Sequence, residues 1–213
     1  MRIVVLGAGG GVGRRAVLAA VEAGHEVVAV ARTAPTVPAG GRAVAADVRD
    51  ARVVREALAG AQAVLWCVGV TKSSGPDVGR ASMPQVVRAA QGLGVGRLVS
   101  VSGAGVTLPG DTKGVGAKFV STLTRTFARH LVEDKRGEHD VLVASRLSWT
   151  EVRPPRMSEA PGTGSWELTD QAPGLKAAPV SKADVAAAMV QLAGSQEWDR
   201  RSPFILAGMR QTS

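Results

Sequence analysis

The sequence predicts an α/β protein built on a doubly wound parallel sheet, and two observations support this prediction. Residues 3–13, IVVLGAGGGVG, join a run of β-branched and leucine residues to a glycine-rich turn, and residues 14–23 then have the composition of a helix. Apolar runs typical of strands alternate with helical patterns along the whole chain. Such alternation indicates a parallel sheet with helices on both faces, joined by right-handed crossovers.

The first half of the chain alternates regularly. The helix expected at Gly11–Ala23 has small apolar side chains on one face and ends at Gly24. The strand Ala63–Cys67 is entirely apolar, which indicates burial on both faces of the sheet. The other elements expected here are the strands Arg2–Leu6, Glu26–Ala31 and Ala43–Ala46 and the helices Ala51–Leu58 and Ser82–Leu93, the last closed by Gly92-Leu93-Gly94.

The second half is less regular. We expect helical structure from about Val115 to Ala144, with a break near Lys135–Glu138. The helix Ser181–Leu192 begins with Ser181 and Asp184 in the spacing of a capping box. The expected strands are Arg97–Val101, Trp149–Arg153 and, near the end, Phe204–Ala207.

No linker or internal repeat divides the sequence, so residues 1–213 are expected to form one domain. Two stretches rich in Pro, Gly and Ser, Thr71–Gly79 and Arg153–Gly174, read as long loops that follow strands. In doubly wound folds such loops build the ligand crevice, so both are candidate walls of a substrate site.

The composition argues against several classes of function. The net charge of +8 comes from dispersed residues, with no Tyr and few aromatic side chains, which argues against nucleic-acid binding. No apolar run is long enough for a membrane helix and no leader is apparent, so a cytoplasmic location is expected. The single cysteine and three scattered histidines predict no metal site. For the oligomeric state, both a monomer and a homodimer are compatible with the sequence.

The glycine turn carries the functional prediction. Gly7, Gly10 and Gly13 have G-x-x-G-x-x-G spacing, and Gly9 and Gly11 are glycine as well. Glycine here permits a tight turn, lets the backbone approach a diphosphate and lets the helix pack close to the strand. The helix N-terminus then offers free N–H groups to the anion. Together with its strand and helix, the turn predicts a dinucleotide-binding unit of the Rossmann type.

The end of the second strand predicts which dinucleotide is bound. NAD-binding units usually place an acidic residue there, on the ribose 2′-hydroxyl. This sequence has Arg32 and Thr33 instead. A guanidinium pairs with a 2′-phosphate, a carboxylate repels it, and Arg14 could reach the same group. We therefore expect NADP(H) rather than NAD(H).

Motifs along nearly the whole chain resemble the atypical short-chain dehydrogenase/reductases with NAD(P)H-binding domains, in the branch of biliverdin-IXβ/flavin reductase and NmrA-like proteins. They are GAGGGVG at 7–13, ARTAP at 31–35, ADV at 46–48, WCVG at 66–69, LVSVSGAG at 98–105, WTEVRPPRM at 149–157 and VSKADVA at 180–186. The order and spacing of these motifs carry the resemblance.

The resemblance implies roles for individual residues. It assigns Asp47 and Val48 to the adenine pocket. It places Cys67, Val68 and Gly69 beside the nicotinamide, with Pro154 and Pro155 near the same ring. It aligns the hydroxyl near the reacting carbonyl with Ser102 or, one residue on, with Gly103. The remaining expected cofactor contacts are Gly7, Gly9, Gly10, Gly11, Val12, Gly13, Arg14, Arg32 and Thr33, and Ser102 is the catalytic candidate.

The chain departs from orthodox members, which use a Tyr-x-x-x-Lys pair, because it contains no tyrosine. Lys113 and Lys118 lie at plausible distances after the fifth strand. Hydride transfer to a flavin, quinone or enone needs little acid catalysis, since the cofactor supplies the chemistry and the protein the placement. The sequence thus favours an NADPH-dependent reductase of a small planar or conjugated acceptor, ketones included. An NADP-sensing regulator, or a biosynthetic ketoreductase, epimerase or cyclase, remains the alternative.

Other polar residues have simpler interpretations. The run Glu133–Arg136 is expected to form an exposed helix face, and His130 and His139 to be solvated. Cys67 is expected to pack rather than to react. Arg153 and Arg156 could hold an anionic substrate or lie on the surface. Two tryptophans complete this set: Trp149 in the core, and Trp166 either in the long loop or stacked on a planar substrate.

Overall fold

A parallel sheet forms the centre of the computed structural model, which describes residues 1–71, 73–108, 111, 128–174 and 176–208. Its six strands run in the order β3-β2-β1-β4-β5-β6, and every neighbouring pair is parallel. The strands are β1 (Arg2–Leu6), β2 (Glu26–Ala31), β3 (Gly41–Ala45), β4 (Ala63–Trp66), β5 (Arg97–Val101) and β6 (Ser148–Val152). The predicted doubly wound sheet is confirmed, with its order reversing between β1 and β4.

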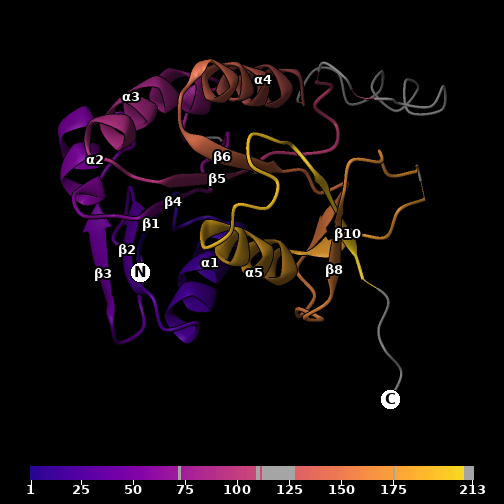
Figure 1. Ribbon diagram of the computed structural model, residues 1–213, viewed down its shortest axis with the longest axis horizontal. Helices are drawn as coiled ribbons and strands as arrows, with labels where there is room; N and C mark the ends of the chain where they lie inside the picture. Colours follow the sequence, from indigo (N-terminus) through magenta and orange to yellow (C-terminus); the bar gives the residue numbers. More distant parts are fainter. Residues whose placement is uncertain (72, 109–110, 112–127, 175, 209–213) are drawn as a thin grey trace.

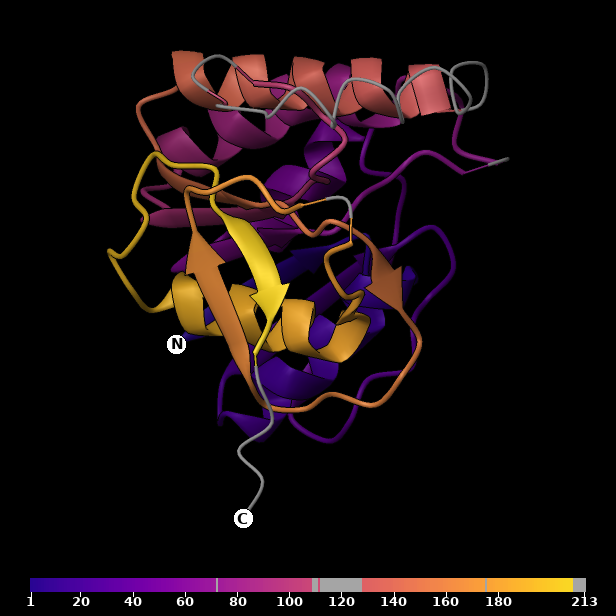
Figure 2. The same ribbon diagram turned by 90° about the vertical axis from the view of Figure 1, so that its right-hand side faces the viewer.

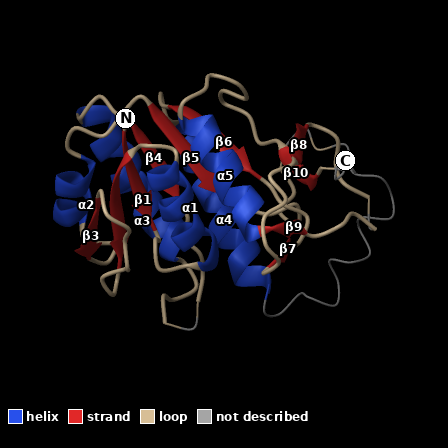
Figure 3. Ribbon diagram, turned by 90° about the horizontal axis from the view of Figure 1, so that it is seen from below, coloured by secondary structure: helices blue, strands red, loops and turns tan. Residues whose placement is uncertain are grey.

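Helices cover both faces of this sheet (Figure 1). On one face lie α2 (Ala51–Leu58), α3 (Val78–Gly92) and α4 (Ala128–Ala144); on the other lie α1 (Gly11–Glu22) and α5 (Lys182–Ala193). Figure 3 shows the same layers from below. Within the described residues, none of these helices is long and apolar enough to cross a bilayer.

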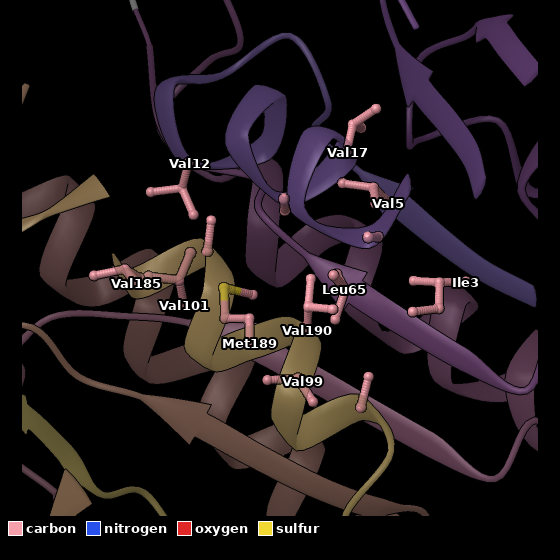
Figure 4. Close-up of a cluster of buried hydrophobic side chains, with 14 of the residues drawn as sticks. Ile3, Val5, Val12, Val17, Leu65, Val99, Val101, Val185, Met189 and Val190 are labelled. Atoms are coloured by element: carbon pink, nitrogen blue, oxygen red, sulfur yellow. The ribbon is translucent and has the colours of Figure 1, made fainter. Parts of the chain in front are cut away.

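Alternating strand residues fill two cores. Ile3 and Val5 point toward α1 and α5, where they pack with Met189 and its neighbours, as Figure 4 shows. Val4 and Leu6 point the other way, toward α2, α3 and α4, in a cluster that also contains Trp66 and the predicted core residue Trp149. These four of the five β1 residues are fully buried. Burial on both sides is the physical reason that residues 3–6 of β1 form an unbroken apolar run.

The last strand does not join the parallel sheet that the alternation of strands and helices predicts. β10 (Phe204–Ala207) forms as expected, but it pairs antiparallel with β8 (Trp166–Thr169) in a separate two-stranded sheet (Figure 2). Arg153 and Phe204 form an isolated bridge, so the chain follows the edge of β6 before it turns away to β8. The predicted loop 153–174 thus contains strands β7 (Met157–Ser158) and β8, and β7 pairs with β9 (Val180–Ser181).

The expected break in the helix near Lys135–Glu138 is wrong, because α4 continues from Ala128 to Ala144. Gly137, within the expected break, lies against Arg80: a Cβ at Gly137 would come within 2.7 Å of the Cβ of Arg80. The glycine therefore permits close packing of α3 on α4 and does not end the helix. The Ser181 half of the expected capping box is confirmed, since the Ser181 hydroxyl accepts a hydrogen bond from the Asp184 N–H at 2.9 Å. The Asp184 carboxylate accepts from the Ser181 hydroxyl and from the N–H groups of Thr163 and Gly164.

Candidate functional site

A cleft of about 2600 Å³ opens where β1, β2, β4 and β5 end. Such a volume is larger than the pocket that one small ligand needs, at about 300–1,000 Å³. The cleft lies at the reversal of strand order, where ligands bind in doubly wound folds. Both predicted wall segments contribute: Thr71, Ser73 and Ser74 line it on one side, and Pro155, Arg156 and Met157 on another.

The glycine turn forms the floor of the cleft, and several of its glycines are required by close packing. Gly7 has φ +86°, and a Cβ there would lie 2.6 Å from the Cys67 carbonyl oxygen. A Cβ on Gly13 would lie 2.2 Å from the Gly7 oxygen. Gly7, Gly9, Gly10, Gly11 and Val12 line the cleft, whereas Gly13 is buried and does not line it. The packing role predicted for the last glycine is confirmed.

Two further glycines keep the cleft open at its other end. A Cβ on Gly69 or Gly103 would meet nothing within 4 Å, and both residues line the cleft. Side chains at these positions would therefore project into the free space after β4 and β5. A flat ring system fits such a glycine-bordered space, which makes the residues present compatible with a bound nicotinamide.

Arg32 and Thr33 line the cleft at the end of β2. The Arg32 guanidinium donates to the Ser73 carbonyl oxygen at 2.6 Å and to the Ser73 hydroxyl at 2.9 Å. Arg32 is nevertheless exposed, so the guanidinium remains accessible from the cleft. Arg14 lies outside the lining and donates to the Gly9 carbonyl oxygen at 2.7 Å, on the rim of the glycine turn.

Asp47 and Val48 follow β3 and form part of the same wall as Arg32. The Asp47 carboxylate accepts from the Arg49 N–H at 2.9 Å, which fixes the turn before α2. The Val48 carbonyl accepts a hydrogen bond from the Gln85 amide. Val48 is buried, so it offers an apolar surface at this end of the cleft.

Cys67 and Val68 line the opposite end. Burial raises the pKa of the Cys67 thiol to about 12, so the thiol is neutral at physiological pH. A neutral thiol is a poor nucleophile, in agreement with a packing role. The Val68 carbonyl accepts a hydrogen bond at 2.7 Å from the ammonium group of Lys135.

Ser102 lies at the end of β5 and lines the cleft. Its N–H donates to the Val152 carbonyl at 2.9 Å, while its hydroxyl oxygen is buried without a hydrogen-bond partner in the described part of the chain. Pro154 is buried and accepts from the Ala104 N–H, but it does not line the cleft; its neighbour Pro155 does. Lys113 and Lys118 lie outside the described residues.

The charged run Glu133–Arg136 is only partly the exposed face that the sequence suggested: Glu133 and Arg136 are exposed, but the two residues between them are buried. Asp134 is fully buried and accepts hydrogen bonds from the N–H groups of Gly79 and Arg80 at the start of α3. Lys135 is buried and forms an ion pair with Glu138. Since the α3 backbone supplies donors and the cleft wall supplies a carbonyl, these charges are satisfied inside the fold.

Two further predictions about charged residues are corrected. His139 is buried, and its Nδ1 lies 2.9 Å from Glu151 Oε2; only His130 is exposed. Arg153 is also buried: it bridges Asp111 and the Val106 carbonyl, and its guanidinium lies 4.2 Å from the Phe204 ring centre. Arg153 therefore anchors the edge of β6 and does not face the cleft.

Arg156 is exposed on the cleft wall and donates to the Ala177 carbonyl at 3.0 Å. Trp166 belongs to β8 and packs, partly buried, against the α1–α5 core, outside the cleft lining.

Sequence reasoning missed two lysines that line the cleft, Lys135 and Lys182. The spacing of Lys135 and Glu138 is a helical ion-pair signal, but the sequence alone did not show that α3 and the β4 loop bury it. Lys182 follows the helix cap Ser181, and its location beside Gly11 depends on the packing of α5 against α1.

Known proteins of similar structure share this fold. A candidate NAD-dependent epimerase/dehydratase from Bacillus halodurans is 25% identical, with a TM-score of 0.78 over 98% of this chain and 94% of that one. A candidate NADH-flavin reductase from Streptococcus pneumoniae is 22% identical, with a TM-score of 0.81 over 97% and 99%. The anaerobillin reductase ChuY from Escherichia coli O157:H7 is also 22% identical, with a TM-score of 0.76 and 97% of each chain covered.

Sequence relatives add a partial match. Uncharacterized proteins of Mycobacterium tuberculosis and Mycobacterium bovis are 37% identical over 103 residues. That stretch is 48% of this chain but 12% of those longer proteins. The sequence profile of the NAD(P)H-binding family matches residues 7–196, from the first glycine of the turn to the segment after α5. With the glycine floor and the open space after β4 and β5, this match shows that the chain belongs to the NAD(P)H-binding family.

Proposed function

We propose that this protein is an NADPH-dependent reductase of a small planar or conjugated acceptor such as a flavin, quinone, enone or ketone. The observation that carries the proposal is a single cleft that joins the glycine turn and Arg32 at one end to Ser102 and two bare glycines at the other. The NAD(P)H-binding family supports the nicotinamide cofactor. The names of two proteins of the same fold, a candidate NADH-flavin reductase and an anaerobillin reductase, support a planar acceptor.

Cofactor binding would divide among three parts of the cleft. The turn Gly9–Val12 would hold the diphosphate through backbone N–H groups at the start of α1. Arg32 and Thr33 would take the 2′-phosphate, and Asp47 and Val48 would border the adenine. Cys67, Val68 and Gly69 would border the nicotinamide, with Lys135 fixing the backbone there through the Val68 carbonyl.

Arg32 is the basis for preferring NADPH over NADH. Its side chain is exposed at the cleft and can form two parallel hydrogen bonds to a phosphate. Ser73, whose hydroxyl already accepts from Arg32, would contribute a further donor to the same phosphate. The residues at the end of β2, Arg32 and Thr33, include no carboxylate to repel it.

The bound cofactor would supply a hydride, and the chain's own residues would position the acceptor and help to complete its protonation. Ser102 is the catalytic candidate, because the residue lines the cleft and its hydroxyl makes no hydrogen bond within the described residues, so that turning the hydroxyl toward an acceptor would break none. It would donate a hydrogen bond to an acceptor oxygen or nitrogen, with water delivering the proton. Arg156, exposed on the same wall, would favour an acceptor that bears an anionic group.

The test is turnover by the purified protein. NADPH oxidation is followed by the loss of its near-ultraviolet absorbance, with flavins, quinones, enones and dicarbonyls offered in turn, and each assay is repeated with NADH. Turnover of one acceptor class with NADPH preferred would support the proposal. Tight NADP⁺ and NADPH binding without turnover of any acceptor would favour a sensing role, and tighter binding of NADH would overturn the cofactor preference.

A further inference from the structure

A cluster of three charged side chains lies at the start of α1, where the glycine turn meets α5. The Lys182 ammonium pairs with one oxygen of Glu159, and Arg15 Nη2 lies 2.9 Å from the other oxygen. Arg15 also donates to the Gly11 carbonyl at 2.8 Å. Two cations thus share one carboxylate, which leaves an excess of positive charge beside a helix whose first turn contains no acidic residue.

Lys182 lies across the glycine turn itself. A Cβ on Gly11 would fall 2.9 Å from Lys182 Nζ and 3.0 Å from its Cδ. The absence of a side chain at Gly11 therefore leaves the space that the Lys182 side chain fills. Both residues line the cleft, together with Gly9 and Gly10. The ammonium group is thus located where an anion on the α1 N-terminus would meet it.

Glu159 belongs to the segment between β7 and β8, and its side chain is 66% exposed. Hydrogen bonding from Lys182 is the foremost cause that lowers its pKa, so the carboxylate is ionised at neutral pH. Because it is exposed, it can leave the two cations for water at little cost. A diphosphate carries more negative charge than a carboxylate and would also accept from the backbone N–H groups of α1.

We propose that Lys182 is a diphosphate-binding residue of the cofactor site, and that Glu159 forms an ion pair with its ammonium group until the diphosphate displaces the carboxylate. This inference rests on the proposed dinucleotide function and extends it to α5 and the segment after β7. It assigns Glu159 an inhibitory role in binding. Arg15, tied to the Gly11 carbonyl, remains in place as the second cation.

The test compares dissociation constants for NADPH, measured by fluorescence at low ionic strength, where exposed charges are least screened. Lys182→Gln should raise the Kd about tenfold, the effect of losing one hydrogen bond to a charged group. Lys182→Arg should restore most of the affinity. Glu159→Gln should lower the Kd by about threefold, because a competitor is removed. Glu56→Gln, which removes an equal charge from the exposed Arg52–Glu56 pair on α2, should leave the Kd unchanged.

The two variants are expected to change the Kd of NADPH in opposite directions, and this distinguishes a binding role from a purely structural one. If the ion pair only braced the fold, Lys182→Gln and Glu159→Gln would weaken binding together. Parallel changes, or no change in either variant while the wild-type protein binds NADPH, would overturn this inference alone. Failure of the wild-type protein to bind any nicotinamide dinucleotide would overturn the proposed function as well. Adenosine 2′-monophosphate, which lacks a diphosphate, should bind the wild-type and Lys182→Gln proteins equally.

Discussion

The Lys135 ammonium group donates hydrogen bonds to both carboxylate oxygens of Glu138, at 3.1 and 2.9 Å, inside the wall of the cleft. Its third contact is the Val68 carbonyl at the end of β4. One buried lysine thus connects α4 to the backbone that would border the nicotinamide. The pair makes the stability of this wall depend on pH.

Burial raises the pKa of Glu138 from 4.5 to about 7, and the nearby Lys135 only partly opposes this. Between those values the unfolded chain has lost the proton that the folded chain retains. We therefore expect the contribution of Glu138 to the free energy of unfolding to fall as pH rises from 4.5 to about 7, with a slope of at most about 1.4 kcal/mol per pH unit. Urea titrations across this range measure the slope.

Glu138→Gln removes the titrating group and should flatten that part of the profile. Glu133→Gln is the matched control, since Glu133 lies on the same helix with an exposed side chain and pairs with Arg129. A wild-type profile that rises with pH across the interval would contradict the expectation.

Arg32→Asp should reverse the cofactor preference. The change removes a guanidinium from the proposed 2′-phosphate site and places there the carboxylate that suits a ribose hydroxyl. Loss of a charge-assisted bond predicts an increase in the Kd of NADPH by about 10- to 100-fold, while NADH binds equally or better. Arg42→Asp makes the same charge change at an exposed position of β3 outside the cleft lining and should alter neither constant. If both variants raised the Kd of NADPH equally, the cause would be the change in the protein's overall charge and not a contact of Arg32 with the phosphate.

Ser102→Ala tests catalysis separately from folding. Because the Ser102 hydroxyl makes no hydrogen bond within the described structure, its removal should leave the free energy of unfolding within about 0.5 kcal/mol. If it donates to the acceptor, kcat should fall by about 10- to 100-fold, in the lower range of losing one such donor. Ser100→Ala is a close control, because that hydroxyl is also buried without a partner among the described residues, on β5 but outside the cleft lining. Equal kcat values for the wild-type and Ser102→Ala proteins would exclude the catalytic role.

Gly13→Ala should destabilise the protein although alanine is the better helix former. The added Cβ would meet the Gly7 oxygen at 2.2 Å and the Ala8 Cα at 2.9 Å, and both are backbone atoms that cannot rotate away. Overpacking of this kind costs about 1–3 kcal/mol. Gly96→Ala, whose Cβ would lie 3.7 Å from its nearest neighbour, should cost far less. Thermal and urea unfolding measure the stability of the two variants. A Gly13→Ala protein as stable as the wild type would refute the packing argument.

The sequence predicted local features wherever the deciding interaction lies close along the chain. The strand Arg2–Leu6 with its apolar residues 3–6, the glycine turn and the Ser181 cap each combine residues within a few positions of one another, and each forms as expected. The same is true of Arg32, whose place at the end of β2 follows from strand periodicity. These features also indicated the sheet, its helices and the NAD(P)H-binding family.

Tertiary structure decided everything that depends on which elements meet. Lys135, Asp134 and His139 are ordinary polar helix residues by sequence, and only the packing of α4 on α3 and β6 buries them. Lys182 reaches Gly11 because α5 packs beside α1, although a long stretch of chain separates the two residues. Local patterns record the periodicity of each element. The contacts between distant side chains depend on the layers into which those elements assemble, and that assembly places the charged groups in the cleft.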